Sequence, residues 1–289
     1  MKIVIIGGYG KMGLWFARLL KSEGHQVTIV GRDKNKLAAA AVELGVSASD
    51  NPGKASEADL VIISVPVDNF EPVCRDLAPH LHPGQKVFDL TSVKVKPVDI
   101  MHRYFTGIKV LGSHPVFGPG AESLKGQNFI LTPTDDVENE TASKLSDWLS
   151  ARGARVRITS PEDHDRLMSI SLGLAHFIAI VTADALVSLD RLDEMSGAGG
   201  ITYKALLTLV ESVLSEDPEL YASLQLNLPA LPEMEKLFGD RANDWAALVR
   251  EGRRDEFVNR MSDLKAKLEA ANPDFGASYQ KLYHLANHR

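Results

Sequence analysis

A histidine and a serine near the middle of the chain have the residue types and spacing for base catalysis. His114 lies in the segment HPVFGP, and Ser92 lies in the earlier segment TSVK. Each segment follows an apolar, strand-like run, so we expect the two side chains at neighbouring strand ends, roughly 5 Å apart. A serine hydroxyl can then hydrogen-bond the imidazole and fix its tautomer, and such an imidazole suits proton abstraction from an alcohol during hydride transfer. The alternative is a histidine with only a structural role in a loop.

A glycine-rich segment near the start, IIGGYGKMG, has the pattern of a dinucleotide-binding turn. We expect Gly8 to permit the tight turn, Gly10 to let backbone N–H groups approach a pyrophosphate, and Gly13 to permit close helix–strand packing. The positive end of the following helix would face the phosphates. The remaining residues predicted for this cofactor loop are Tyr9, Lys11 and Met12. The alternative is a glycine-rich turn kept for packing.

The end of the second strand-like run indicates which nicotinamide cofactor is bound. NAD-binding domains carry an acid there for the ribose 2′-hydroxyl, but this chain has Gly31 followed by Arg32. Arginine suits a 2′-phosphate because its guanidinium makes bidentate contacts, and Lys36 adds charge one turn later. We therefore predict NADP. NAD is the alternative, in which Asp33 would reach back to the ribose.

A second loop, of Ser64, Val65 and Pro66, should also border the cofactor. It follows a strand-like run, and loops at the carboxyl ends of parallel strands border the ligand crevice. We expect its backbone beside the nicotinamide ribose, although Pro66 also marks a strand end.

The elements that position these residues alternate through the first half of the chain. Short continuous apolar runs, typical of strands buried on both faces, alternate with helical patterns at residues 12–22 and 34–44. This pattern predicts an α/β fold, a Rossmann-type doubly wound sheet at residues 1–160. The strand-like runs lie at residues 2–8, 26–32, 59–66, 86–92, 109–115, 128–133 and 154–159.

Residues 161–289 are predicted to form an all-α domain, with the boundary near TSPED. Residues 164–189 form a long apolar run that is too polar at its ends for a membrane span. We expect a helix buried all round, inside this domain or in a dimer core. The further helices are predicted at residues 203–215, 218–226, 231–237, 243–250 and 255–270.

The composition is that of a soluble globular protein, with 289 residues, 44% hydrophobic and 24% charged. The net charge of −6 argues against a general nucleic-acid binder. The single cysteine, Cys74, excludes an internal disulfide and is expected to be a buried apolar residue. No signal peptide, membrane span or metal-ligand spacing is visible, which favours a cytoplasmic protein without a metal or membrane partner.

Several segments together resemble the prephenate/arogenate dehydrogenase family of tyrosine biosynthesis: GGYGKMG, DLTSVK, HPVFGP, EDHDRLM and DPELYASLQ, in order over nearly the whole chain. The resemblance implies oxidative decarboxylation of prephenate or arogenate to 4-hydroxyphenylpyruvate or tyrosine. It implies that His114 accepts the proton of the ring 4-hydroxyl and that Ser92 hydrogen-bonds this histidine. His176, twelve residues after His164, would contact substrate, with a structural core histidine as the alternative. His164 would cap or orient its helix. A homodimer through the helical domain is also implied.

The chain departs from the family at Ser212, where an arginine that binds the ring carboxylate is expected. A serine does not replace a bidentate guanidinium. Lys204 keeps a basic residue eight positions earlier, about 12 Å along a helix from Ser212, and Arg166 or Lys94 would be other candidates. We therefore take His176, Lys94, Lys204 and Ser212 as the substrate-binding set.

Three alternatives stay open. The chain would be a family member acting on another cyclic or β-hydroxy acid, a β-hydroxy-acid dehydrogenase proper, which shares a Rossmann domain followed by a helical domain, or a regulator that senses NADP without turnover. The second would need a catalytic lysine in the long helix at residues 164–189, which has none. Prephenate and arogenate stay equal alternatives, and neither a chorismate mutase segment nor a regulatory tyrosine-binding domain is expected.

Overall fold

The computed structural model describes residues 1–287 and divides the chain into two compact units. The first comprises Met1–Met168 together with Leu226–Pro229. The second comprises the other described residues, 169–225 and 230–287. The division falls at Met168, eight residues beyond the boundary expected at residue 160, because the first turns of the long apolar helix belong with the sheet.

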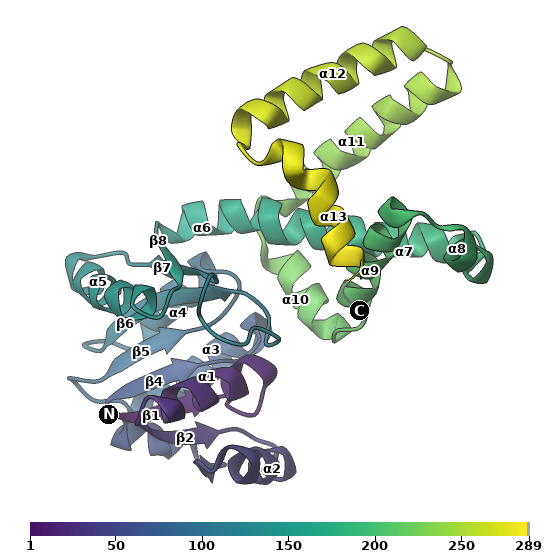
Figure 1. The fold of residues 1–289 in the computed structure, drawn as a ribbon. Helices are drawn as coiled ribbons and strands as arrows, with labels where there is room; N and C mark the ends of the chain where they lie inside the picture. The colour runs from purple at the N-terminus through teal and green to yellow at the C-terminus, as the bar shows by residue number, and fades with distance from the viewer. Residues whose placement is uncertain (288–289) are drawn as a thin grey trace. The chain divides into compact units, whose positions relative to one another are not determined.

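The first unit contains one eight-stranded sheet with the order β3-β2-β1-β4-β5-β6-β7-β8 (Figure 1). All neighbouring strands are parallel except β6 and β7, which are antiparallel. The fold class expected from the sequence is confirmed. Strand β3 was not predicted, because its three residues are small and mostly exposed. The strands are β1 (Lys2–Ile6), β2 (Gln26–Val30), β3 (Ser47–Ser49), β4 (Leu60–Ile63), β5 (Lys86–Asp89), β6 (Lys109–Val116), β7 (Asn128–Thr132) and β8 (Arg155–Ile158).

Helices cover both faces of this sheet, which explains the continuous apolar strands. Ile3 and Ile5 of β1 face one core with α1 (Lys11–Ser22), α2 (Lys34–Leu44) and α5 (Asp136–Ser150). Val4 and Ile6 face the opposite core, in which Cys74 is fully buried. The elements on that second face are η1 (Pro52–Glu57), η2 (Val67–Asn69), α3 (Phe70–Leu77), η3 (Ala78–His80) and α4 (Val95–Tyr104).

The long apolar run forms three consecutive helical segments instead of one regular helix. Helix α6 (Pro161–Met168) leads into a π-helical segment, η4 (Ser169–Leu174), and then into α7 (Ala175–Ser188). By length and composition the stretch Pro161–Ser188 could cross a membrane, with a mean hydropathy of 1.9, and only 11% of the apolar window is buried. The expectation of a helix buried within the chain is wrong, because Ala179 alone is buried in α7.

The rest of the second unit is helical, as expected. The two helices expected at residues 231–237 and 243–250 form one continuous helix, because Gly239 is tolerated inside it. The sequence reading also missed α8 and α13. The helices of this part are α8 (Leu192–Ala198), α9 (Ile201–Leu214), α10 (Pro218–Asn227), α11 (Leu231–Arg250), α12 (Arg254–Ala271), η5 (Phe275–Ala277) and α13 (Ser278–Asn287).

Candidate active site

The glycine loop joins β1 to α1 through a turn that depends on Gly7. Gly7 has a φ of +76°, and a Cβ there would clash with the carbonyl oxygen of Ser64. The glycine pattern predicted the tight turn at Gly8, but this residue lies against Ile29, where an added Cβ would come within 2.6 Å of a side-chain carbon. The adjacent pair Gly7 and Gly8 was the feature of the sequence that could have indicated the tight turn at Gly7. Gly13 permits close packing, since its Cβ would lie 2.7 Å from the Gly7 carbonyl oxygen.

The first turn of α1 fits a phosphate group. Gly10 is the N-cap residue, no side chain caps the helix, and no acidic residue lies in the first turn. Its backbone N–H groups and the helix dipole therefore favour an anion at this end. Lys11 is exposed in the same turn, and Met12 packs against the core below it. The loop thus has the features of a dinucleotide cradle.

The residues after β2 are arranged around the ring of Tyr9. This ring lies against Gly31, where a Cβ would clash with it, and the Lys36 ammonium lies 6.0 Å from the ring centroid. Asp33 caps α2, because its Oδ1 accepts hydrogen bonds of 3.0 Å from two backbone N–H groups of the helix. Arg32 is exposed and forms no ion pair within residues 1–287. This end of the site carries the exposed cations Arg32 and Lys36, and the Asp33 carboxylate is engaged by the helix.

The loop of Ser64, Val65 and Pro66 lies beside the glycine loop. The Ser64 N–H donates to the carbonyl of Ile6, the last residue of β1, over 2.8 Å. Ser64 and Val65 are half-buried, and Pro66 is exposed. The two loops thus form one edge of the sheet, at the carboxyl ends of β1 and β4, where ligands of such sheets bind.

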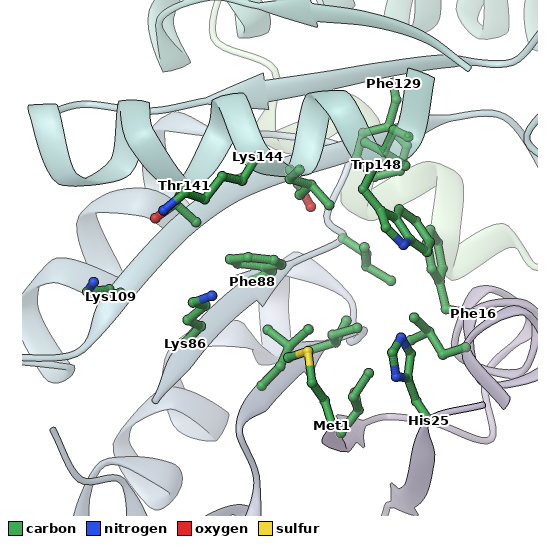
Figure 2. A pocket seen from close by; sticks show the side chains of 18 of the residues that line it. Met1, Phe16, His25, Lys86, Phe88, Lys109, Phe129, Thr141, Lys144 and Trp148 are labelled. Atoms are coloured by element: carbon green, nitrogen blue, oxygen red, sulfur yellow. The ribbon is translucent and has the colours of Figure 1, made fainter. Parts of the chain in front are cut away.

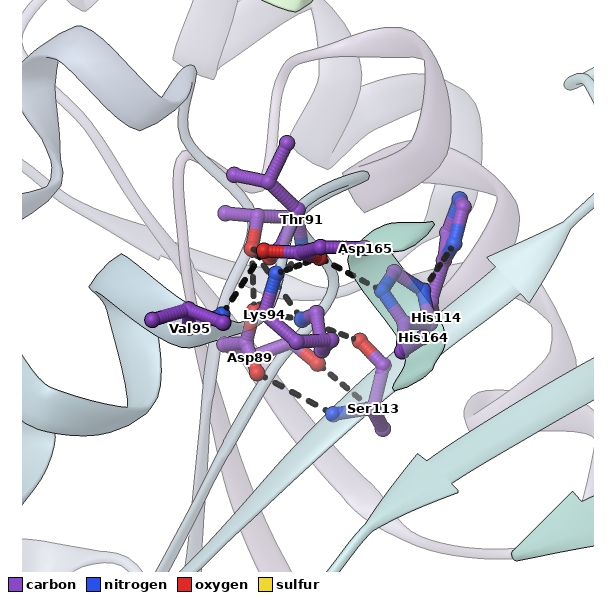
Figure 3. Close-up of polar contacts among 9 residues, drawn as sticks. Asp89, Thr91, Lys94, Val95, Ser113, His114, His164 and Asp165 are labelled. Carbon is purple, nitrogen blue, oxygen red and sulfur yellow. Dashed lines mark hydrogen bonds and ion pairs between the residues drawn. The ribbon is translucent and has the colours of Figure 1, made fainter. Parts of the chain in front are cut away.

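His114 is buried within β6 and belongs to a chain of three polar side chains (Figure 3). Its Nδ1 lies 2.9 Å from Nε2 of His164, and Nδ1 of His164 lies 2.7 Å from Oδ1 of Asp165. The Asp165 carboxylate also accepts hydrogen bonds from the backbone N–H groups of Lys94 and Val95, at 2.7 and 3.0 Å. The start of α6 is thereby fixed against the start of α4.

This chain of hydrogen bonds assigns the tautomers of both histidines. A carboxylate only accepts, so His164 carries its proton on Nδ1 and presents a lone pair on Nε2. His114 must then donate from Nδ1, which leaves the lone pair of its neutral ring on Nε2. No described residue hydrogen-bonds that nitrogen. Nε2 of His114 is consequently the atom able to accept a proton.

Ser92 does not occupy the position expected of it. The residue is half-buried, three positions after the end of β5, and within the described chain its hydroxyl makes no hydrogen bond to His114. His164 takes the place of the expected partner. Sequence reasoning gave His164 only a helix-capping role, because no spacing rule links residues fifty positions apart on different elements.

Lys94 is fully buried and has no donor left for a substrate (Figure 3). Its ammonium forms an ion pair with Asp89 and donates to the Thr91 hydroxyl and the Ser113 carbonyl, at 3.1 and 2.8 Å. Asp89 in turn accepts from the Ser113 N–H, next to His114. The structure therefore corrects the substrate-binding expectation for Lys94, because its ammonium is engaged by Asp89, Thr91 and Ser113 inside the sheet unit.

Burial controls the protonation of the histidine pair. Desolvation holds the pKa of His114 well below 6.5, and the neighbouring His164 and Lys94 act in the same direction. Desolvation also lowers the pKa of His164, against the opposing effect of Asp165. For Lys94 the pKa is lowered by desolvation, partly offset by Asp89. At neutral pH His114 is therefore an uncharged imidazole, the form that acts as a base.

The other predicted substrate residues lie in the second compact unit. His176 is half-buried, and no described residue hydrogen-bonds its Nδ1. It meets Tyr221 edge-to-face at 4.8 Å between ring centroids, and burial lowers its pKa. Ser212 is exposed and its hydroxyl donates to the Leu209 carbonyl within α9. Lys204 is exposed on the same helix. These residues thus belong to a different unit from His114 and Lys94.

The described residues offer neither a metal site nor an unpaired cation at Arg166. Within residues 1–287 no group of three or more histidine, cysteine or acidic side chains could hold a metal ion. Arg166 is exposed and pairs with Asp163 on its own helix at 2.8 Å. Among the described residues, the groups suited to catalysis and cofactor binding therefore lie in the hydrogen-bond chain of His114, His164 and Asp165 and in the glycine loop.

Comparison with known proteins relates both units to one family. Residues 16–158 match the family model for the prephenate dehydrogenase nucleotide-binding domain, and residues 160–263 match the prephenate dehydrogenase dimerization domain. A probable arogenate/prephenate dehydrogenase of Methanocaldococcus jannaschii is 34% identical over 96% of this chain and 63% of its own length. The T-protein of Haemophilus influenzae is 29% identical over 89% of this chain and 65% of its own.

The chain thus spans less than two thirds of the length of these relatives. Among solved structures, prephenate dehydrogenase from Aquifex aeolicus, in complex with hydroxyphenyl propionate and NAD+, superimposes with a TM-score of 0.79 and 23% identity. The match covers 94% of this chain and 98% of that one. At this identity the superposition establishes a shared fold.

Proposed function

The chain belongs to the prephenate dehydrogenase family, and from this premise we propose that it catalyses the NADP-dependent oxidative decarboxylation of prephenate or arogenate. The products would be 4-hydroxyphenylpyruvate or tyrosine. The observation that carries this proposal is the hydrogen-bond chain from Asp165 through His164 to His114, which leaves Nε2 of His114 as a proton acceptor.

In the proposed mechanism, Nε2 of His114 accepts the proton of the ring 4-hydroxyl. The imidazolium that forms donates from Nδ1 to His164, and Asp165 compensates the positive charge through the second imidazole. Bound NADP in its oxidised form supplies the hydride acceptor for C4 of the ring. The C–C bond to the ring carboxylate breaks, CO₂ leaves, and its electron pair completes the aromatic ring.

Several features of the glycine loop and of the segment after β2 support the proposed cofactor site. The glycine turn and the uncapped start of α1 suit the pyrophosphate, and the loop at Ser64 lies beside this turn. For the 2′-phosphate, Arg32 and Lys36 offer cations, and Asp33 is engaged by α2 and so does not compete for a ribose hydroxyl. NAD is the alternative cofactor, and an activity assay with each cofactor distinguishes the two.

We further propose a homodimer formed through the helical unit of a cytoplasmic protein. Helix α7 is rich in apolar residues but mostly uncovered within one chain, with Val181 and Val187 exposed. The matching family model for this part is described as a dimerization domain. A second copy would shield this apolar surface from water. Sedimentation equilibrium should give twice the chain mass, and a monomer would contradict this arrangement.

A second candidate function is suggested by Ser212. Its exposed hydroxyl, bonded within α9, offers no charge for a ring carboxylate. The chain would then be a dehydrogenase of the same family acting on a related cyclic acid whose recognition does not need an arginine there. His176 and Lys204 remain the proposed substrate contacts in either case.

The proposal is tested by following reduced-nicotinamide absorbance with prephenate and with arogenate, each with NADP and with NAD. We expect turnover of at least one acid with NADP. His114→Asn should lower kcat about 10²- to 10⁴-fold, the usual contribution of a general base, while the Kd for NADP stays unchanged. Wild-type turnover by this variant would overturn the role of His114. NADP binding without turnover of either acid would favour the related-acid function or an NADP-sensing regulator.

A further inference from the structure

A cavity lies on the α1 and α5 face of the sheet, apart from the cofactor loop and His114. It opens over the middle strands β4 and β5, between the two helices, and its volume is about 270 Å³ (Figure 2). A mostly parallel sheet normally has helices over both faces. Here the gap exposes apolar and aromatic side chains, chiefly Ile3, Phe16, Ile62, Phe88, Phe129 and Trp148.

One end of this cavity carries three ammonium groups. Lys86 and Lys109 are register partners at the starts of the parallel strands β5 and β6, so their side chains project from the same face of the sheet. Lys144 reaches the same end from α5, as Figure 2 shows. Like charges on adjacent strands are unfavourable unless an anion lies between them. The aromatic rings of Phe16 and Trp148 lie toward the other end.

Among the described residues that line the cavity, Glu140 carries the one carboxylate at this cationic end. Glu140 pairs with Lys144 at 2.5 Å, and its pKa is lowered first by the hydrogen bond from Lys144 and further by the charges of Lys109 and Lys86. Lys86 and Lys109 form no ion pair of their own within the described part of the chain. Two lysines at the mouth are therefore available to an external anion.

From this combination we propose a binding site for a small aryl carboxylate, with the aromatic body over Phe88 and the carboxylate between Lys86 and Lys109. The volume lies just below the range of sites for drug-sized ligands, so it suits a single ring system with a short acidic chain. Aromatic rings at one end and cations at the other define the orientation. His114 and the glycine loop do not line this cavity.

Isothermal titration with 3-(2-naphthyl)propionate tests the site in the full-length protein. We expect saturable binding at one site per chain, and the neutral analogue 2-(2-naphthyl)ethanol should bind about tenfold more weakly because it lacks the charge-assisted contacts. The double variant Lys86→Gln/Lys109→Gln should weaken the acid about tenfold and leave the alcohol unchanged. The matched control Lys265→Gln/Lys267→Gln removes two exposed charges from α12 and should bind like wild type.

A second variant keeps the test independent of charge. Leu145→Trp, on the cavity wall in α5, should fill the space and abolish binding of both ligands while retaining a cooperative thermal transition. Equal affinity for acid and alcohol would overturn the proposed ligand class. Absence of binding, or binding that survives Leu145→Trp, would overturn the site. These readouts need no turnover, so they stand or fall separately from the proposed dehydrogenase activity.

Discussion

Nδ1 of His114 in β6 lies 2.9 Å from Nε2 of His164, which belongs to helix α6, and this helix begins 47 residues after His114. This contact decides which nitrogen of His114 is basic. It also makes Asp165, through His164, the group that fixes the orientation of the proposed base.

Removing the His164 acceptor should impair the proposed base without disturbing the cofactor loop. For His164→Phe we expect kcat to fall about 10- to 100-fold, less than the full effect of losing a general base. Because His164 accepts the Nδ1–H of His114, its loss should also change the pKa of His114 and thereby shift the acidic limb of the pH profile. Steady-state kinetics across pH measure both effects. An unchanged profile together with unchanged kcat would show that His164 does not position His114.

The pH profile of the wild-type protein should reflect the buried state of His114. Desolvation holds its pKa well below 6.5, so the base stays unprotonated as the pH falls to that value. We expect kcat/KM to be flat from about pH 8 to pH 6.5 and to decline only below this range. A loss of half the activity at or above pH 6.5, at saturating cofactor, would argue against His114 as the titrating base.

Stability should decrease on mild acidification. His114, His164 and His176 all have a folded-state pKa lowered by burial, whereas the unfolded chain binds protons near the ordinary value of 6.5. The unfolded state therefore binds more protons below this pH, so the stability present above pH 6.5 is lost as the pH falls. Urea unfolding at about pH 7.5 and pH 5.5 measures the difference. His114→Asn should show a smaller difference, and an equal one would contradict this cause.

Lys94 should matter for stability through its ion pair with Asp89. Lys94→Met leaves a buried carboxylate without its counter-ion, a loss of about 3–5 kcal/mol in the free energy of unfolding. Lys96→Met, two residues away and exposed, is the matched control and should change stability by about 0.5 kcal/mol or less. Urea titrations compare the two. If Lys94→Met were as stable as wild type but raised the KM for substrate, the substrate-binding role would be restored.

Arg32 should distinguish NADP from NAD. Arg32→Ser removes the guanidinium proposed to meet the 2′-phosphate, so the Kd for NADP should rise about 10- to 100-fold while that for NAD is unchanged. Lys34→Ser, in the next turn, loses an exposed ion pair with Asp50 and serves as the control. Fluorescence titration of both reduced cofactors gives the affinities. An equal rise in the Kd values for NADP and NAD would show that Arg32 does not act through the 2′-phosphate.

The local pattern of the sequence determined the fold and the cofactor loop. Continuous apolar runs separated by amphipathic helices are sufficient to predict a parallel sheet, because both of its faces must be buried. The glycine pattern likewise predicts its turn, since the need for glycine is local, although the structure moves the tight turn from Gly8 to Gly7. The capping of α2 by Asp33 is also local, because its side chain accepts hydrogen bonds from the backbone N–H groups of Asn35 and Lys36.

Only the tertiary structure decided the partners of the buried polar groups. His114 meets His164 in place of Ser92, and Lys94 turns into the interior toward Asp89, because strand β6 and helix α6 bring distant segments together. The uncovered face of α7 and the cavity between α1 and α5 also result from the way in which whole elements pack. A sequence specifies which residues prefer burial, but which side chains meet depends on how complete elements pack, and that is a property of the folded chain.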